Sequence, residues 1–119
     1  MFLRVIFQET GNFEKGTIRA FGEKPDGWTK PDEVEIESLT ATQKKAFAAV
    51  VATIQAKGEP WSATQVWVYS AIDPESDPAA PALRLVIEAQ HDETGALKTF
   101  PDMYVTDASA IKLFNTLTK

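Results

Sequence analysis

The chain has 119 residues and a net charge of −5, from 17 acidic and 12 basic side chains. Hydrophobic residues make up 44% and charged residues 24%, which is typical of one globular domain. Because there is no cysteine, disulfides, thiolate metal sites and a cysteine nucleophile are excluded. The acidic balance and the lack of a basic stripe argue against nucleic-acid binding. No apolar run approaches the roughly 18 residues of a membrane span.

The N-terminal region has the composition of β-strands separated by turns. Two segments rich in β-forming residues predict strands at 2–8 and 17–22. The apolar run at the start of the sequence, MFLRVIF, is interrupted by Arg4 and is too short for the apolar centre of a secretory signal. We therefore expect this segment to be part of the folded domain, and the protein to work in the cytoplasm or in a virion.

Strict alternation over residues 32–37 predicts a third strand. Val34 and Ile36 are expected to face inward. The other face then carries a row of three carboxylates, those of Glu33, Glu35 and Glu37. A glycosidase pair needs at least one carboxyl group among apolar neighbours, and this pattern provides no such pocket. We interpret the row as a solvated face that protects a sheet edge.

The only long helix that the pattern supports covers residues 41–57. Thr40 and Gln43 have the spacing of a capping box, and Gly58 suits the left-handed position that follows a helix. An apolar stripe is expected to face the core, formed by Phe47, Val50, Val51 and Ile54. The opposite arc is rich in alanine and permits close approach by a partner; it holds Lys45, Ala46, Ala48, Ala49, Ala52, Thr53 and Ala56.

A strand that is apolar on both sides is predicted at residues 64–72. Val66 and Val68 face one way, whereas Trp67 and Tyr69 face the other. Such a strand is typical of the centre of a sheet or of a sheet covered on both faces. The next segment, 73–81, contains three prolines and predicts an irregular loop or arm.

The C-terminal third predicts a hairpin followed by a short helix. The strands of the hairpin begin near Leu83 and at Leu97, with Gly95 at the left-handed position of the turn. Pro101 lacks an amide hydrogen, which indicates an edge strand or a bulge. Thr106 or Asp107 is expected to cap the helix. Together the elements predict a single α+β domain over residues 1–119, with five to seven mostly antiparallel strands and the main helix on one face.

Signatures of catalysis and metal binding are weak. His91 is the only histidine and lies beside a predicted turn, so an acid–base pair lacks its second member. Asp73, Glu75 and Asp77 alternate like the start of a calcium loop, but prolines interrupt the pattern and the required glycine and glutamate are absent. Phosphate-loop, dinucleotide and hydrolase motifs are also absent from the sequence. We expect no enzymatic activity, no cofactor and no metal.

Two tryptophans, Trp28 and Trp61, follow predicted turns, where a large ring either anchors a partner or closes the end of the core. With the alanine arc at Ala48, Ala49 and Ala52, they favour a non-enzymatic subunit that binds proteins or copies of itself. Bacteriophage virion and accessory proteins often have this composition.

Two alternatives stay open on the sequence alone. The first is a small acidic inhibitor that docks the carboxylates of residues 32–37 on a basic site of an enzyme or nucleic-acid-binding protein. The second is a small hydrolase or carbohydrate-binding module that uses His91 or the exposed tryptophans.

Overall fold

The computed structural model describes residues 1–118, which form six strands, one 3-10 turn and two α-helices. In chain order the elements are β1 (Phe2–Phe7), β2 (Gly16–Phe21), β3 (Glu33–Glu35), η1 (Ile36–Ser38), α1 (Ala41–Gln55), β4 (Trp61–Ile72), β5 (Pro81–His91), β6 (Leu97–Val105) and α2 (Ala108–Thr118). The strands form one sheet in the order β3-β2-β1-β4-β5-β6, and every neighbouring pair is antiparallel. The predicted α+β class is confirmed.

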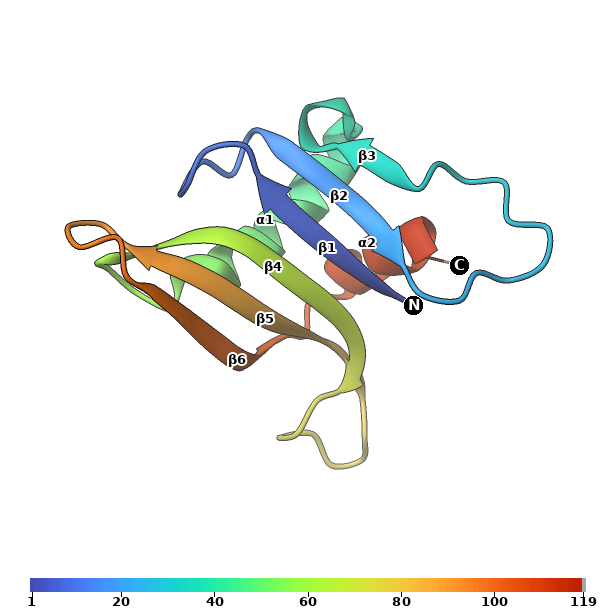
Figure 1. The fold of residues 1–119 in the computed structure, drawn as a ribbon. Helices are drawn as coiled ribbons and strands as arrows, with labels where there is room; N and C mark the ends of the chain where they lie inside the picture. Colours follow the sequence, from blue (N-terminus) through green and yellow to red (C-terminus); the bar gives the residue numbers. More distant parts are fainter. Residues whose placement is uncertain (119) are drawn as a thin grey trace.

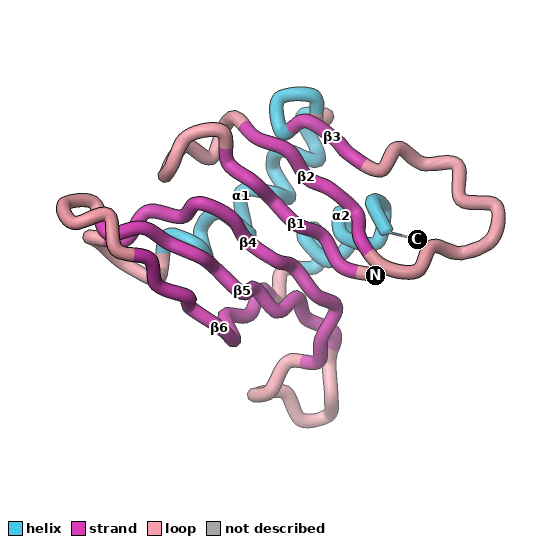
Figure 2. Tube along the Cα trace, in the orientation of Figure 1, coloured by secondary structure: helices cyan, strands magenta, loops and turns pink. Residues whose placement is uncertain are grey.

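The two helices lie on the same face of the sheet. In Figure 1 both are behind the strands, and no helix or strand of the described residues covers the near face (Figure 2). We call the uncovered side the open face and the other side the helix face. Residues alternate between the two faces along each strand, as a pleated sheet requires.

The hydrophobic core fills the space between the sheet and the helices. The strands contribute residues of alternate positions, among them Leu3, Val5, Val66, Val68, Leu85 and Ile87. The helices contribute Phe47, Val50, Ile54, Leu113 and Phe114. Because both helices cover the same face, the core is a single layer.

The capping box at the start of α1 is confirmed. The backbone amide of Gln43 donates to Oγ1 of Thr40 at 3.1 Å, and the amide of Thr40 donates to Oε1 of Gln43 at 3.0 Å. These bonds satisfy two amides that a helix start leaves without partners. The helix ends at Gln55, two residues before the predicted end, and Gly58 has the expected positive φ of 84°.

The alanine arc of α1 is narrower than predicted. Ala46 is buried in the core, and Ala49 is partly buried against it. Ala48 and Ala52 remain exposed. The prediction that Ala46 faces outward was therefore wrong, because Ala46 lies one helical turn before the buried Val50 and so shares its side of α1.

Both edges of the sheet differ from regular strands. The predicted third strand stops at Glu35, because the chain turns into η1 and places Ile36 and Leu39 in the core. Glu37 lies in that turn, so the predicted three-carboxylate row on one strand was wrong. At the other edge, Leu85 pairs with Met103 and Ile87 with Phe100, which leaves a bulge at Pro101 as predicted.

Candidate functional site

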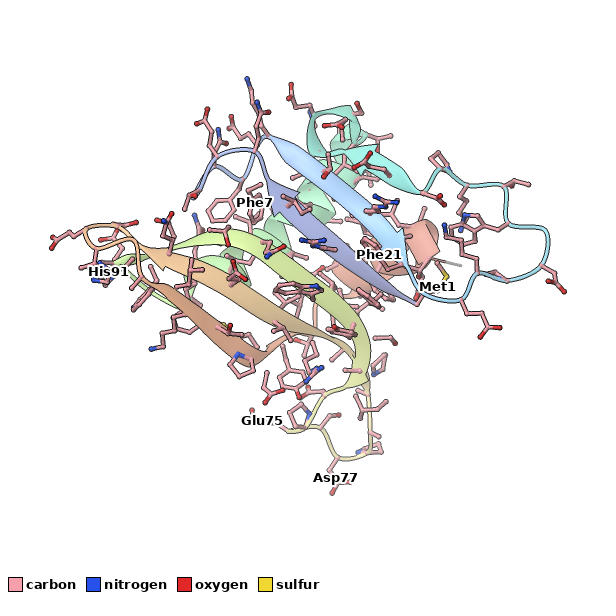
Figure 3. All side chains as sticks on the ribbon, viewed as in Figure 1. Met1, Phe7, Phe21, Glu75, Asp77 and His91 are labelled. Atoms are coloured by element: carbon pink, nitrogen blue, oxygen red, sulfur yellow. The ribbon has the colours of Figure 1, made fainter. Side chains whose placement is uncertain are left out.

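The open face is lined by alternate residues of all six strands. The pairing register places one row of five side chains directly opposite one another on neighbouring strands: Phe21, Phe2, Tyr69, Arg84 and Tyr104. The next row contains Glu33, Arg19, Arg4, Trp67 and Val86. A third row contains Glu35, Thr17, Ile6, Gln65, Glu88 and Thr99. Figure 3 shows the face from the side of these residues, with Phe21 labelled.

Aromatic rings stack on one another across the centre of this face. The Phe2 ring lies between that of Phe21, at 5.6 Å and 13° between planes, and that of Tyr69, at 5.2 Å and 29°. The Arg19 guanidinium lies 5.2 Å from the Phe21 ring centre, and that of Arg84 lies 5.0 Å from the Tyr69 ring centre. We call these five side chains the aromatic ladder. Each aromatic pair adds roughly 0.5–1.5 kcal/mol beyond area burial, so the ladder is held in place before any partner binds.

Hydrogen bonds link three polar side chains at the centre of the open face. Arg4 donates to Oε1 of Gln65 through Nε at 2.9 Å and through Nη2 at 2.7 Å. Gln65 in turn donates through Nε2 to Oε2 of Glu88 at 3.2 Å. These bonds connect β1, β4 and β5, so the amphipathic side chains are ordered across three strands.

The bulge in β6 aims a carboxylate at the end of the ladder. Asp102 has a φ of 60°, the left-handed conformation that aspartate tolerates better than most residues. Its Oδ1 accepts from Nη1 of Arg84 at 3.0 Å. Bulges commonly redirect a side chain in this way. Arg84 is thus held on one side by the Tyr69 ring and on another by the Asp102 carboxylate.

The composition of the open face differs from that of the rest of the chain. All three arginines and both tyrosines of the sequence lie on it. The one lysine on a strand, Lys98, lies on the helix face, where its Nζ is 5.4 Å from the Trp61 ring centre and 4.8 Å from that of Phe100. Protein interfaces are enriched in aromatic residues and arginine and depleted in lysine.

The two candidate tryptophans lie away from the open face. Trp61 is half-buried on the helix face and makes edge-on contacts with His91, at 5.1 Å between ring centres, and with Phe100, at 6.1 Å. Trp28 is half-buried against the core, with the Lys30 ammonium 5.3 Å from its ring centre. These positions fit the alternative that both rings close the ends of the core.

His91 accepts backbone hydrogen bonds within the β5–β6 turn. Its Nδ1 accepts from the amides of Glu93 and Thr94, both at 3.2 Å. Ser62 donates through its hydroxyl to Oδ1 of Asp92 at 2.5 Å. A nucleophile needs its base within hydrogen-bond reach, and here the serine bonds to the aspartate directly, while the histidine ring nitrogen holds the turn. The arrangement stabilises the hairpin and does not form a catalytic relay.

The acidic loop between β4 and β5 does not form a calcium-like cage. Asp73 uses Oδ1 to accept from the amide of Glu75 at 3.0 Å, which is a local turn bond. Glu75 and Asp77 project outward from the loop (Figure 3). Within residues 1–118 no three histidine, aspartate or glutamate side chains gather as metal ligands. No helix in that same span is long and apolar enough to cross a bilayer.

A groove of about 940 Å³ runs between the β1–β2 loop and α1. Its apolar lining comes from Phe13, Ile36, Phe47 and Val51, and Ala48 of the alanine arc also lines it. The polar groups at the groove belong to Asn12, Glu14, Lys15, Glu37 and Lys44. The lining contains no serine, histidine or cysteine, so it holds no nucleophile and base of the usual hydrolase kind.

Known proteins do not supply a family for this chain. No protein-family model, no curated protein and no solved structure matches it. The open face is therefore the candidate site on the strength of its own geometry and composition.

Proposed function

We propose that the protein is a non-enzymatic binding subunit that recognises another protein through the open face. The observation that carries this proposal is the aromatic ladder, which places apolar rings and two guanidiniums on an uncovered sheet. Binding energy in protein interfaces is concentrated in tryptophan, tyrosine and arginine, and the open face carries all three types. Their order before binding reduces the entropy that association costs.

The stacking geometry favours a protein partner over a nucleic acid. Proteins that bind single strands stack bases on free aromatic ring faces. In the ladder, the Phe2 ring stacks between the rings of Phe21 and Tyr69, and a guanidinium lies 5.2 Å from the Phe21 ring centre and another 5.0 Å from the Tyr69 ring centre. The rings of the ladder therefore stack on one another and on guanidiniums, which leaves less free ring face for a stacking base. Four carboxylates on the same face, those of Glu33, Glu35, Glu88 and Asp102, would also repel phosphates.

The edges of the sheet are poor binding sites in comparison. β3 has only three residues, two of which are glutamates, and β6 is interrupted by Pro101 and a bulge. Short charged strands, prolines and bulges are the usual devices that prevent pairing at a sheet edge. A partner therefore gains more binding energy by packing on the open face than by pairing a strand with an edge of the sheet. A structural subunit of a larger assembly, such as a virion, needs a preformed flat contact of this kind.

Site-specific photo-cross-linking in the cells that produce the protein tests the proposal. A benzophenone amino acid is placed at Tyr104 on the open face, or at Ala52 on the exposed side of α1 as the matched control. We expect protein adducts from position 104 and none from position 52. Adducts from position 52 alone, or from neither position, would contradict the proposal.

A further inference from the structure

We infer that the partner is a second copy of this chain, and that two open faces pack against each other. The inference rests on the proposed function and adds the identity of the partner to it. The resulting dimer has four layers, with the two sheets inside and a helix pair outside each sheet.

The shape of the open face suits another sheet. Two sheets pack about 10 Å apart with strands about 30° from parallel, because both have the same twist. A second copy supplies that twist by construction. The central rows contain half-buried side chains that point outward, including Phe2, Trp67, Tyr69 and Val86. Such side chains can interdigitate with the same rows of a copy.

The size of the face is close to that of a stable interface. Six strands spaced about 4.8 Å apart and three rows of outward residues about 6.8 Å apart give a face of roughly 600 Å². Specific interfaces bury about 600–1,000 Å² on each partner, so the whole face reaches the lower end of the standard size. Ile6, at 38% exposure, is a large apolar residue within it that a copy would cover.

The charges of the face permit contact with an identical face despite the net charge of −5. Three guanidiniums are mixed with the four carboxylates, so the face is nearly neutral. Arg4 is bonded through Gln65 towards Glu88, and Arg84 is bonded to Asp102. Groups that are already paired lose less when water is removed than isolated charges do. Two identical open faces therefore repel each other only weakly.

The test is molar mass by light scattering across a hundredfold range of concentration. We expect the wild type to form a dimer of two 13.1 kDa chains. Val86→Glu and Ile6→Glu each place a new charge at a position that the interface would bury but that is half-buried or exposed in the monomer, so both should raise the dimer dissociation constant at least ~100-fold. Circular dichroism checks that each variant is folded. Ala52→Glu, on the exposed side of α1, should dimerise like the wild type.

Each contrary outcome has a different meaning. A wild type that is monomeric at every concentration overturns the self-association, while adducts from Tyr104 to a different protein would still support the proposed function. A dimer that both folded face variants leave intact places the interface elsewhere and overturns the inference. Loss of the dimer in Ala52→Glu alone would move the interface to the alanine arc and overturn it as well.

Discussion

The guanidinium of Arg84 lies 5.0 Å from the ring centre of Tyr69, on the neighbouring strand, while its Nη1 donates to Asp102 on the other side. One arginine thus joins β4, β5 and β6 on the open face. A planar guanidinium can stack on a ring and form a directed hydrogen bond at the same time, whereas a lysine ammonium acts as a compact charge. This geometry suggests a role for Arg84 in ordering the face.

The first prediction concerns Arg84→Lys. We expect the free energy of unfolding to change by less than about 1 kcal/mol, because exposed ion pairs contribute little to stability. The dimer dissociation constant should rise about tenfold, since the ladder loses the stacked end that holds Tyr69. Urea unfolding and light scattering measure the two quantities. An unchanged dissociation constant in a folded variant would show that dimerisation does not depend on the stacked guanidinium of Arg84.

The second prediction compares neighbours on β5 that point to opposite faces. Leu85 is fully buried in the core, whereas Val86 is partly exposed on the open face. Leu85→Ala should cost about 2–5 kcal/mol of monomer stability, because it removes buried methyl groups and leaves a cavity. Val86→Ala should cost well under half as much. Chemical denaturation at a concentration too low for association measures both, and equal losses would mean that the open face is covered within the monomer.

The third prediction concerns the start of α1. Thr40→Ala removes the hydroxyl that accepts from the Gln43 amide, and should cost about 1 kcal/mol, as is usual for such caps. Lys45→Ala, on an exposed position of the same helix, serves as the control and should change stability by less than about 0.5 kcal/mol. Thermal unfolding followed by circular dichroism compares the two. A Thr40 variant as stable as the control would exclude the capping box as a source of stability.

The fourth prediction concerns acid pH and the start of α2. Hydrogen bonds from the Ser109 hydroxyl and the Ala110 amide lower the pKa of Asp107 below its usual 3.8. A lowered pKa in the folded state means that the unfolded chain binds the proton first. The stability that Asp107 contributes is therefore present above pH 3.8 and is lost as the pH falls through the lowered pKa.

Asp107→Asn isolates this effect, because asparagine caps a helix but does not titrate. We expect the melting temperature of the variant to fall less steeply with acidification than that of the wild type. A residual slope should remain, since Lys24 also lowers the pKa of Asp32 through a hydrogen bond and its charge. Parallel curves for the two proteins from neutral pH down to about pH 2 would contradict the assignment.

Much of the fold could be predicted because its signals are local. Alternation along β4 identified its two faces, the spacing of Thr40 and Gln43 identified the start of α1, and Pro101 identified the bulge. Each of these depends on residues within a few positions of one another. The early end of β3 was missed because Ile36 can enter the core equally well from a strand or from a tight turn.

The binding face could not be predicted because it depends on strand order. Phe2 and Tyr69 are neighbours only because β1 pairs with β4, across more than sixty residues of chain. The sequence does show that Trp67 and Tyr69 point away from the core residues of β4. Of the two alternatives for such a strand, the central position is confirmed, since β4 lies between β1 and β5, and no helix or strand of the described residues covers its second face. All three arginines alternate along their strands with core residues. This alternation, which is visible in the sequence, was a further signal that the arginines lie on the face away from the core.

The most direct measurement for the open face as the binding surface is hydroxyl-radical labelling, read by mass spectrometry, in intact cells and in dilute purified protein. The account predicts that labelling of Trp67, Tyr69 and Tyr104 falls several-fold in cells. Labelling of Trp61, on the helix face, should stay unchanged and serves as the internal control. Equal labelling of the three open-face residues under both conditions would contradict the account.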